Sequence, residues 1–472
     1  MIPNLQNMQL SEEDDDDYNL SLSKFESMMK TNKVLFFDSE EFEDIILHYL
    51  DMGKPNLAKK ALKLALDQHP KSTGLKLVQV EMLVFEDKLD AAEKMLNELY
   101  LIEPTNEEVY IQKANIYSKR DNHQKAVELL EIALKYTDDL ADVYNLIGME
   151  YLFMDDFEQA KIHFTKCLEV DIEEQTAIYN VVYCYEFLDQ NEEALVYLNE
   201  YLDRNPYAEI GWHQAGRLYY HIKDYTNAIR AFEFATYIDD EFLGAFMEMG
   251  KAFEKVKNYD KAIESYQKTI ELDDPTSYAL LRIGKCHEKL GNKTIAIKYY
   301  NKTVHEDPLL DKGWIAITDF YIREKNFSKA LYFVNKALGI DNENKLYWKR
   351  FASINKELNF FEEAEYGYRK AVQYGDNQLD TWLYWVDVLQ FQGEFEMAKN
   401  TLLMATEFFP ESFEIEYRLA GLNYMDGKLV KGKFHLCNGL RLSYKNHDLI
   451  KNLFPVVWDR KVVQTEIEKH NN

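Results

Sequence analysis

The sequence is poor in cysteine, proline and cations, and it has no long apolar run. Its four cysteines, among 472 residues, include no CxxC pair, so we expect buried thiols in a reducing compartment rather than a metal or redox centre. No run of 18 uncharged apolar residues occurs, so no membrane span is expected. The 55 lysines and arginines are outnumbered by 82 acids, for a formal charge of −27. Such a surface repels nucleic acid and anionic lipid, which makes both unlikely partners.

Signals for export, catalysis and disorder are also scarce. The N-terminus MIPNLQNMQL has neither a cationic start nor an apolar stretch, so we predict a cytoplasmic protein. No P-loop, dinucleotide-binding, HExxH or GxSxG motif appears, and the sequence predicts no enzyme, no cofactor and no metal. With 46% hydrophobic and 14% aromatic residues but only 9 prolines, the chain is expected to be ordered and helical.

What the sequence does have is a period of 34 residues. Eleven of its 31 alanines fall on one series spaced by 34: Ala58, Ala92, Ala126, Ala160, Ala194, Ala228, Ala262, Ala296, Ala330, Ala364 and Ala398. A second series holds mostly small residues, and a third holds aromatic or aliphatic ones. A period of this length that never slips indicates a repeat architecture rather than a set of globular domains.

The clearest repeat is Leu243–Asp274, which reads as two amphipathic helices joined by a short polar turn. Its small residues Gly250 and Ala262 let the two helix axes approach closely, and Phe253 and Tyr266 fill the seam between them. We therefore predict a helical hairpin that recurs along the chain.

The period and the pattern of small, aromatic and proline positions resemble the tetratricopeptide-repeat (TPR) family, in particular cytoplasmic bacterial multi-repeat scaffold proteins. The resemblance implies an all-α fold, a right-handed α-solenoid or superhelix of twelve helix-turn-helix units with capping helices at both ends. The predicted boundaries are a disordered acidic tail at 1–19, an N-terminal capping helix at 20–38, the twelve units at 39–446, and a C-terminal capping helix and tail at 447–472.

The terminal helices are predicted from local signals. A capping box at Ser23 and Glu26 would start a helix running to about residue 33, with Leu22, Phe25 and Met29 on its apolar side. Beyond residue 446 the stretch 447–458 carries Leu449, Leu453, Phe454 and Trp458 as a covering element, and the polar residues 459–472 are expected to fray. Repeat twelve departs from the pattern, with Gly432 and Gly439 in usually larger slots.

Four tryptophans share one 34-residue series, which invites a reading as ligand contacts. The series comprises Trp212, Trp314, Trp348 and Trp382, together with Phe42, Tyr110, Tyr144 and Phe246. Because apolar residues of several kinds share the position, we interpret the tryptophans mainly as packing residues.

The resemblance implies that the first helices line a concave groove in which extended peptides or partner helices bind. Two groups on first helices are not used by the packing series: an aromatic and amide-rich segment, and a basic strip in which Arg217, Lys251 and Lys285 share one 34-residue series. The candidate partner-binding residues are Tyr179, Asn180, Tyr183, Phe187, His213, Gln214, Arg217, Tyr220, His221, Lys251, Arg282, Lys285, Lys312, Lys349 and Arg350.

The basic strip has two readings. Arginine and lysine donors would bind an acidic peptide or a C-terminal carboxylate through charge-assisted hydrogen bonds. Alternatively the strip is a solvated face with local ion pairs such as Glu248–Lys251 and Lys285–Glu288. The carboxylate clamp of chaperone-binding family members is not present as a set, since Lys312 is followed one turn later by Ala316.

Three functions follow from this reading. The first is a non-catalytic scaffold or adaptor that binds protein or peptide partners in the groove. The second is a regulator that responds to a peptide or small ligand, and the third and weakest is RNA or polyanion binding through the basic strip. The oligomeric state and the partner are not specified by the sequence.

Overall fold

The computed structural model describes residues 21–30, 35–272 and 276–470, and every regular element within these ranges is a helix. The chain divides into two compact units, Met1–Asp240 and Glu241–Asn472, called unit 1 and unit 2 below. The predicted all-α helical-repeat class is confirmed, while the handedness and the number of units stay predictions. The predicted disordered tail at 1–19 lies outside the described residues.

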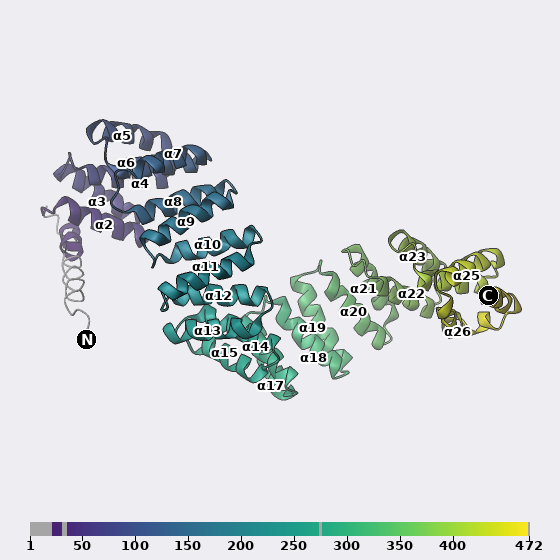
Figure 1. Cartoon of the computed structure of the whole chain (residues 1–472). Helices are drawn as coiled ribbons and strands as arrows, with labels where there is room; N and C mark the ends of the chain where they lie inside the picture. The colour runs from purple at the N-terminus through teal and green to yellow at the C-terminus, as the bar shows by residue number, and fades with distance from the viewer. Residues whose placement is uncertain (1–20, 31–34, 273–275, 471–472) are drawn as a thin grey trace. The chain divides into compact units, whose positions relative to one another are not determined.

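Unit 1 begins with a helix at residues 21–30 and continues as consecutive two-helix hairpins (Figure 1). Its helices are α2 (Ser39–Asp51), α3 (Pro55–Gln68), α4 (Thr73–Phe85), α5 (Leu89–Ile102), α6 (Glu107–Lys119), α7 (His123–Ala133), α8 (Leu140–Phe153), α9 (Phe157–Val170), α10 (Gln175–Phe187), α11 (Asn191–Arg204), α12 (Glu209–His221) and α13 (Tyr225–Ile238).

Unit 2 continues the same alternation and ends in shorter helices. Its elements are α14 (Leu243–Lys255), α15 (Tyr259–Leu272), α16 (Ser277–Lys289), α17 (Lys293–Glu306), α18 (Asp311–Arg323), α19 (Phe327–Ile340), α20 (Lys345–Glu357), α21 (Phe361–Gln373), α22 (Leu379–Phe391), α23 (Phe395–Phe408), α24 (Phe413–Met425), α25 (Leu429–Ser443), the 3₁₀ turn η1 (Tyr444–Asn446), α26 (Asp448–Leu453), α27 (Pro455–Trp458) and α28 (Lys461–Lys469). From α2 to α25, even-numbered helices are the first helix of a hairpin and odd-numbered ones the second.

The alanine series forms the tightest part of each hairpin. All eleven of its alanines are 0% exposed, which places the series at the positions where helices approach most closely. A methyl group is the largest side chain that such a contact accepts, because protein interiors are packed close to crystal density. The regular spacing of alanine therefore has a packing cause.

Opposite the alanines, glycine on the first helix accommodates an aromatic ring from the second. A Cβ added at Gly250 would lie 2.6 Å from the ring of Tyr266, and a Cβ at Gly284 would lie 2.6 Å from the ring of Tyr300. Gly148 and Gly216 receive phenylalanine rings in the same way. Glycine at these positions lets a large buried ring occupy the space that a side chain would otherwise take.

The turn inside each hairpin holds one residue in the left-handed region of backbone space. The positions are again spaced by 34: Gly53, Asp87, Asp121, Asp155, Asp189, Lys223, Lys257, Gly291, Lys325, Asn359, Gly393 and Gly427, with φ between 55° and 82°. An L-residue pays roughly 1–2 kcal/mol in this conformation. Lysine at three of these positions shows that the hairpin geometry, not local preference, sets the turn.

The N-terminal helix differs in detail from its prediction. Residues 21 and 22 are already helical, so Ser23 is not the N-cap. Phe25 is buried as expected, but Met28 rather than Met29 faces the core, and Met29 is 37% exposed. The capping box occurs instead at α2, where the backbone N–H of Asp38 donates to the Glu41 carboxylate at 2.8 Å.

The C-terminal end is more ordered than predicted. Residues 461–469 form α28 rather than a frayed tail, because Val463 and Ile467 are buried against the last hairpin. Glu466 accepts hydrogen bonds from Lys433 at 2.8 Å and Lys469 at 2.9 Å. These hydrogen bonds lower the pKa of the Glu466 carboxyl to about 2.

The irregular glycines of the last hairpin have a packing role. A Cβ at Gly432 would lie 2.8 Å from the Tyr424 ring, and one at Gly439 would lie 2.9 Å from the Tyr417 ring. Here the large side chain is on the first helix and glycine is on the second, the reverse of the arrangement at Gly250. In the last hairpin the glycine and the ring have therefore exchanged helices, and its departure from the repeat pattern has a packing cause.

Candidate functional site

The exposed side chains of the first helices form a surface that we call the first-helix face. In unit 1 two rings of this face, Tyr183 and Phe187 on α10, lie against Phe157 at the start of the second helix α9, and we call these three rings the aromatic cluster. The Phe187 ring centroid lies 4.6 Å from those of Phe157 and Tyr183. Phe187 is nevertheless 58% exposed and Tyr183 43% exposed. Tyr179, one turn earlier on α10, is also exposed.

The polar candidates around this cluster are engaged with one another. Arg217 Nη1 donates to Gln214 at 2.8 Å, and Arg217 Nη2 lies 3.7 Å from the Glu186 carboxylate. Asn180 Nδ2 lies 3.7 Å from the Met149 sulfur. Their first-helix position is as predicted, but their hydrogen-bonding groups are mostly directed at neighbouring hairpins.

Two candidates on α12 are buried. His213 is 8% exposed and Gln214 is 0% exposed. The His213 ring packs 5.8 Å from that of Phe232 on α13, and burial together with the nearby Arg217 lowers the pKa of His213 to about 4. Both side chains are therefore buried rather than exposed, and their part in partner binding stays a prediction.

The last two candidates of this segment remain at the surface. Tyr220 is half-buried, with its ring 5.3 Å from that of Tyr225. His221 is exposed at the end of α12. Arg217 lies in unit 1 and Lys251 and Lys285 in unit 2, so the predicted strip is described separately in each unit.

In unit 2 the arginines of the basic strip are already paired. Arg282 donates from Nε to Glu254 at 2.7 Å, and Arg350 forms a bidentate pair with Asp319 at 2.7 and 3.0 Å. In both pairs the partners lie on consecutive first helices, about one repeat apart in the chain. Bidentate pairs of this kind are among the stronger surface interactions, and they hold neighbouring hairpins in register.

The lysines of the strip are partly compensated. Lys251 lies 3.8 Å from Glu248, and Lys349 donates to Gln378 at 2.8 Å and lies 3.7 Å from the buried Asp376. The first of these is the local ion pair expected from the sequence. Much of the strip is therefore an internally neutralised face.

Lys285 and Lys312 differ from the others, since neither has an ion pair within the described residues. Burial, with Arg282 and Lys312 nearby, lowers the pKa of Lys285. The expected pair with Glu288 does not form, because Glu288 instead accepts from Arg323 and from the Tyr300 hydroxyl. Lys312 is exposed at the start of α18.

The tryptophans have the packing role predicted for them. The indole N–H of Trp212, Trp314 and Trp348 each donates to the backbone carbonyl six residues earlier, at 2.8 to 2.9 Å. Each indole also lies against a ring of the second helix in its own hairpin, for example Trp314 against Phe333 with centroids 6.1 Å apart. Trp382 is 1% exposed.

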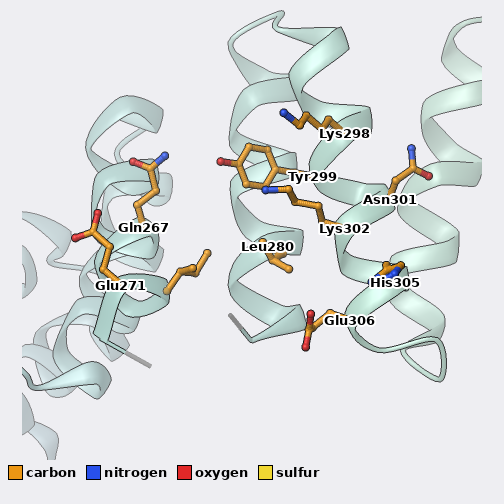
Figure 2. A pocket seen from close by; sticks show the side chains of 10 residues that line it. Gln267, Glu271, Leu280, Lys298, Tyr299, Asn301, Lys302, His305 and Glu306 are labelled. Atoms are coloured by element: carbon orange, nitrogen blue, oxygen red, sulfur yellow. The ribbon is translucent and has the colours of Figure 1, made fainter. Parts of the chain in front are cut away.

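Unit 2 also has a cleft that was not predicted from the sequence. It lies between α15, α16 and α17. It has a volume of about 820 Å³ and is lined by Gln267, Ile270, Glu271, Leu280, Lys298, Tyr299, Asn301, Lys302, His305 and Glu306. Figure 2 shows Gln267 and Glu271 on one wall, with Lys298, Tyr299 and Lys302 on the other and Leu280 between them. The signal that could have found it is Leu280, which occupies the tryptophan series with a smaller side chain.

The chemistry available elsewhere is limited. Among the described residues no group of three or more His, Cys, Asp or Glu side chains is placed to hold a metal ion. All four cysteines are free, and burial raises the pKa of Cys167, Cys184 and Cys286 to about 12. Within the same ranges, no helix is both long and apolar enough to span a bilayer.

Stacked two-helix hairpins with a 34-residue period define a helical-repeat protein. Models of the tetratricopeptide repeat match residues 107–139, 141–171 and 211–242, and a second such model matches residues 247–310. The matched segments are tetratricopeptide repeats, so the chain contains repeats of this family. Family membership of the remaining hairpins, and the predicted bacterial source and cytoplasmic location, stay predictions.

One curated relative is Anaphase-promoting complex subunit 3 of Schizosaccharomyces pombe, which is 24% identical over 167 residues. The match covers 34% of this chain and 25% of the relative, so the chain spans about a quarter of the curated relative's length. The repeat fold is in general a scaffold for protein interactions, and this broad function applies to the chain.

Two solved structures match the chain at low identity. The APC/C hetero-tetramer Cut9–Hcn1 is 14% identical, with 97% of this chain and 94% of that chain covered and a TM-score of 0.36. The C-terminal part of a TPR repeat-containing protein from Cytophaga hutchinsonii is 16% identical, with 58% and 98% covered and a TM-score of 0.40. These TM-scores are low, so neither match carries an argument about function.

Proposed function

We propose that this protein is a non-catalytic scaffold that binds a partner peptide or helix on the first-helix face of unit 1, at the aromatic cluster. The observation that carries the proposal is the exposure of Tyr183 and Phe187, which lie against each other but remain open to solvent. A contiguous group of exposed rings is rare on a monomer surface without a partner. Aromatic side chains also dominate the binding energy of protein interfaces.

The structure favours an apolar contact over the acidic-peptide contact expected from the sequence. Arg282 and Arg350 already hold carboxylates of their own chain, and an incoming acidic group would have to displace them. Among the cations of the basic strip in the described part of unit 2, an acidic or C-terminal-carboxylate partner would find Lys285 and Lys312 without ion pairs. We therefore place the main anchor at the aromatic cluster and keep acidic recognition as a secondary contribution.

A single substitution tests the proposal. Phe187→Ser removes the most exposed ring of the cluster, and Tyr237→Ser is the matched control, because Tyr237 is an exposed ring on the second helix α13. We expect quantitative affinity capture from source-cell extract to lose partners with Phe187→Ser that Tyr237→Ser retains. Equal capture by both variants would refute binding at this cluster.

RNA binding has less support than the sequence indicated, because the guanidinium groups of the strip are neutralised. Salt titration decides this alternative directly. A polyanion site would give RNA binding whose logarithm falls linearly with the logarithm of salt concentration. Absence of binding at low salt would remove it.

A further inference from the structure

The cleft between α15 and α17 exists where a hairpin lacks an indole. Leu280 stands on the series that holds Trp314 and Trp348 in the next two hairpins. Trp314 packs against hydrophobic clusters on both of its sides. Leucine at position 280 reaches less far, and it forms the floor of the cleft instead of filling it.

The wall facing Leu280 is made of the positions that meet the indole in other hairpins. Trp314 lies against Phe333, and Trp348 lies against Tyr366 at 5.5 Å. In the hairpin of Leu280 these two positions are Tyr299, one repeat before Phe333, and Lys298, two repeats before Tyr366, and both line the cleft. The α17 wall therefore keeps one ring, Tyr299, which stacks on the His287 ring with centroids 5.6 Å apart and has leucine instead of an indole at position 280.

The charges of the same wall favour anions. Lys298 and Lys302 have no ion pair within the described residues, and Lys302 lies 5.1 Å from the centroid of the Tyr299 ring. On the opposite wall Glu271 is paired with Lys268 at 3.2 Å, and Glu306 lies at the far end of α17. The side of the cleft next to Tyr299 is thus the cationic side, in a chain whose formal charge is −27.

The size of the cleft fits a short peptide. Its α17 wall runs from Lys298 to Glu306, roughly 12 Å at 1.5 Å per residue. An extended peptide covers that length with about four residues. A buried aromatic anchor with charged neighbours is the usual composition of a short binding segment of this kind.

We propose that this cleft binds an acidic peptide segment of a partner protein, with an aromatic side chain placed between Leu280 and Tyr299 and carboxylates on Lys298 and Lys302. The incoming ring supplies the stacking partner that tryptophan supplies in the next hairpin. Lysine–carboxylate hydrogen bonds fix the flanking residues. Nine of the cleft's ten lining residues are on the second helices α15 and α17, so it is a second binding site and does not rest on the aromatic cluster.

The test uses the full chain and a dye-labelled peptide Glu-Glu-Trp-Glu-Glu in fluorescence anisotropy. We expect saturable binding with a dissociation constant below about 1 mM. Leu280→Trp restores the side chain found at Trp314, so it should fold normally and weaken binding by roughly tenfold or more. Lys302→Glu should weaken binding by about fivefold or more through loss of one charge-assisted contact.

A matched control exists one repeat later. Lys336 occupies the position of Lys302 on α19 and lies 5.5 Å from the Tyr332 ring centroid, but it does not line the cleft. Lys336→Glu should leave binding unchanged, and the peptide Glu-Glu-Ala-Glu-Glu should bind far more weakly than the tryptophan peptide. Phe187→Ser should have no effect, which separates this site from the proposed function. No saturable binding, or equal binding by Leu280→Trp with an unchanged melting curve, would overturn the proposal.

Discussion

Replacing Gly250 by alanine tests whether a ring–glycine contact sets the spacing of the hairpin helices. The new Cβ would lie 2.6 Å from Cε1 of Tyr266, about 1 Å closer than a normal carbon contact. Tyr266 cannot easily move away, because it is fully buried and its hydroxyl donates to Glu254 at 2.7 Å. Overpacking of this kind costs about 1–3 kcal/mol.

The measured loss of stability will be smaller than this packing cost, because alanine is a better helix former than glycine by roughly 0.5–1 kcal/mol. Gly339 supplies the correction. It lies in α19 of the same unit, and a Cβ there would have no neighbour within 4 Å. Gly339→Ala should therefore gain up to about 1 kcal/mol in stability, and the difference between the two variants isolates the packing cost.

Urea unfolding followed by far-UV circular dichroism measures both variants, and amide hydrogen exchange locates the change. We expect the midpoint of Gly250→Ala to fall below that of the parent and that of Gly339→Ala to rise or stay level. Faster exchange should appear in α14 and α15 only for Gly250→Ala. A Gly250→Ala variant at least as stable as Gly339→Ala would refute the argument that the ring holds the two helices at their observed spacing.

Three further perturbations follow from the same structure. Ala262→Leu should lower the free energy of unfolding by about 1–3 kcal/mol, and a variant as stable as the parent in urea would contradict the close crossing. Lys257→Gly, at φ 62°, should raise it by roughly 1 kcal/mol, and a lower urea midpoint would show that the turn is not strained. The folded-state pKa of His213, about 4, is below its ordinary 6.5, so the unfolded state binds the proton first and stability should fall by roughly 3 kcal/mol as pH drops from 6.5 to 4. His213→Gln should flatten that part of the pH–stability curve, and an unchanged slope would assign it to other groups.

The packing of the hairpins could be predicted from the sequence because it uses side chains whose size is itself the signal. Alanine at every position from Ala58 to Ala398 on one series has one simple explanation, a close helix contact, and the structure shows it. The glycine–ring fit at Gly250 and Tyr266 follows from the same reasoning. Size complementarity repeats with the period, so each hairpin strengthens the inference from the others.

Features that depend on direction rather than size were not predictable in the same way. His213 and Gln214 stand on a first helix beside exposed residues, but both are buried, and the His213 ring lies against Phe232 on α13. The positive φ of the turn residues was not predicted, because aspartate and lysine, unlike glycine, do not indicate the left-handed region of backbone space. Their regular spacing becomes informative only when the backbone is known.

The sequence left two readings of the basic strip open, because the partners of its charges are distant in the chain. Ion pairs three or four residues apart on one helix can be predicted from the sequence, and the Glu248–Lys251 pair is one of them. The pairs that neutralise Arg282 and Arg350 lie 28 and 31 residues away, on the preceding first helix. Long-range pairing of this kind is fixed by the stacking of hairpins, which no single helix reveals.

The Asp319–Arg350 ion pair also favours the observed order of hairpins along the chain. Eleven hairpins present the same buried alanine, so packing at that position does not distinguish one neighbouring hairpin from another. If residues 311–344 were excised, the chain would rejoin in phase, but Arg350 would then stand where Ala316 now stands, facing Lys285. Two cations would meet at that junction in place of an ion pair. Ion pairs between consecutive first helices therefore favour one order of hairpins over another.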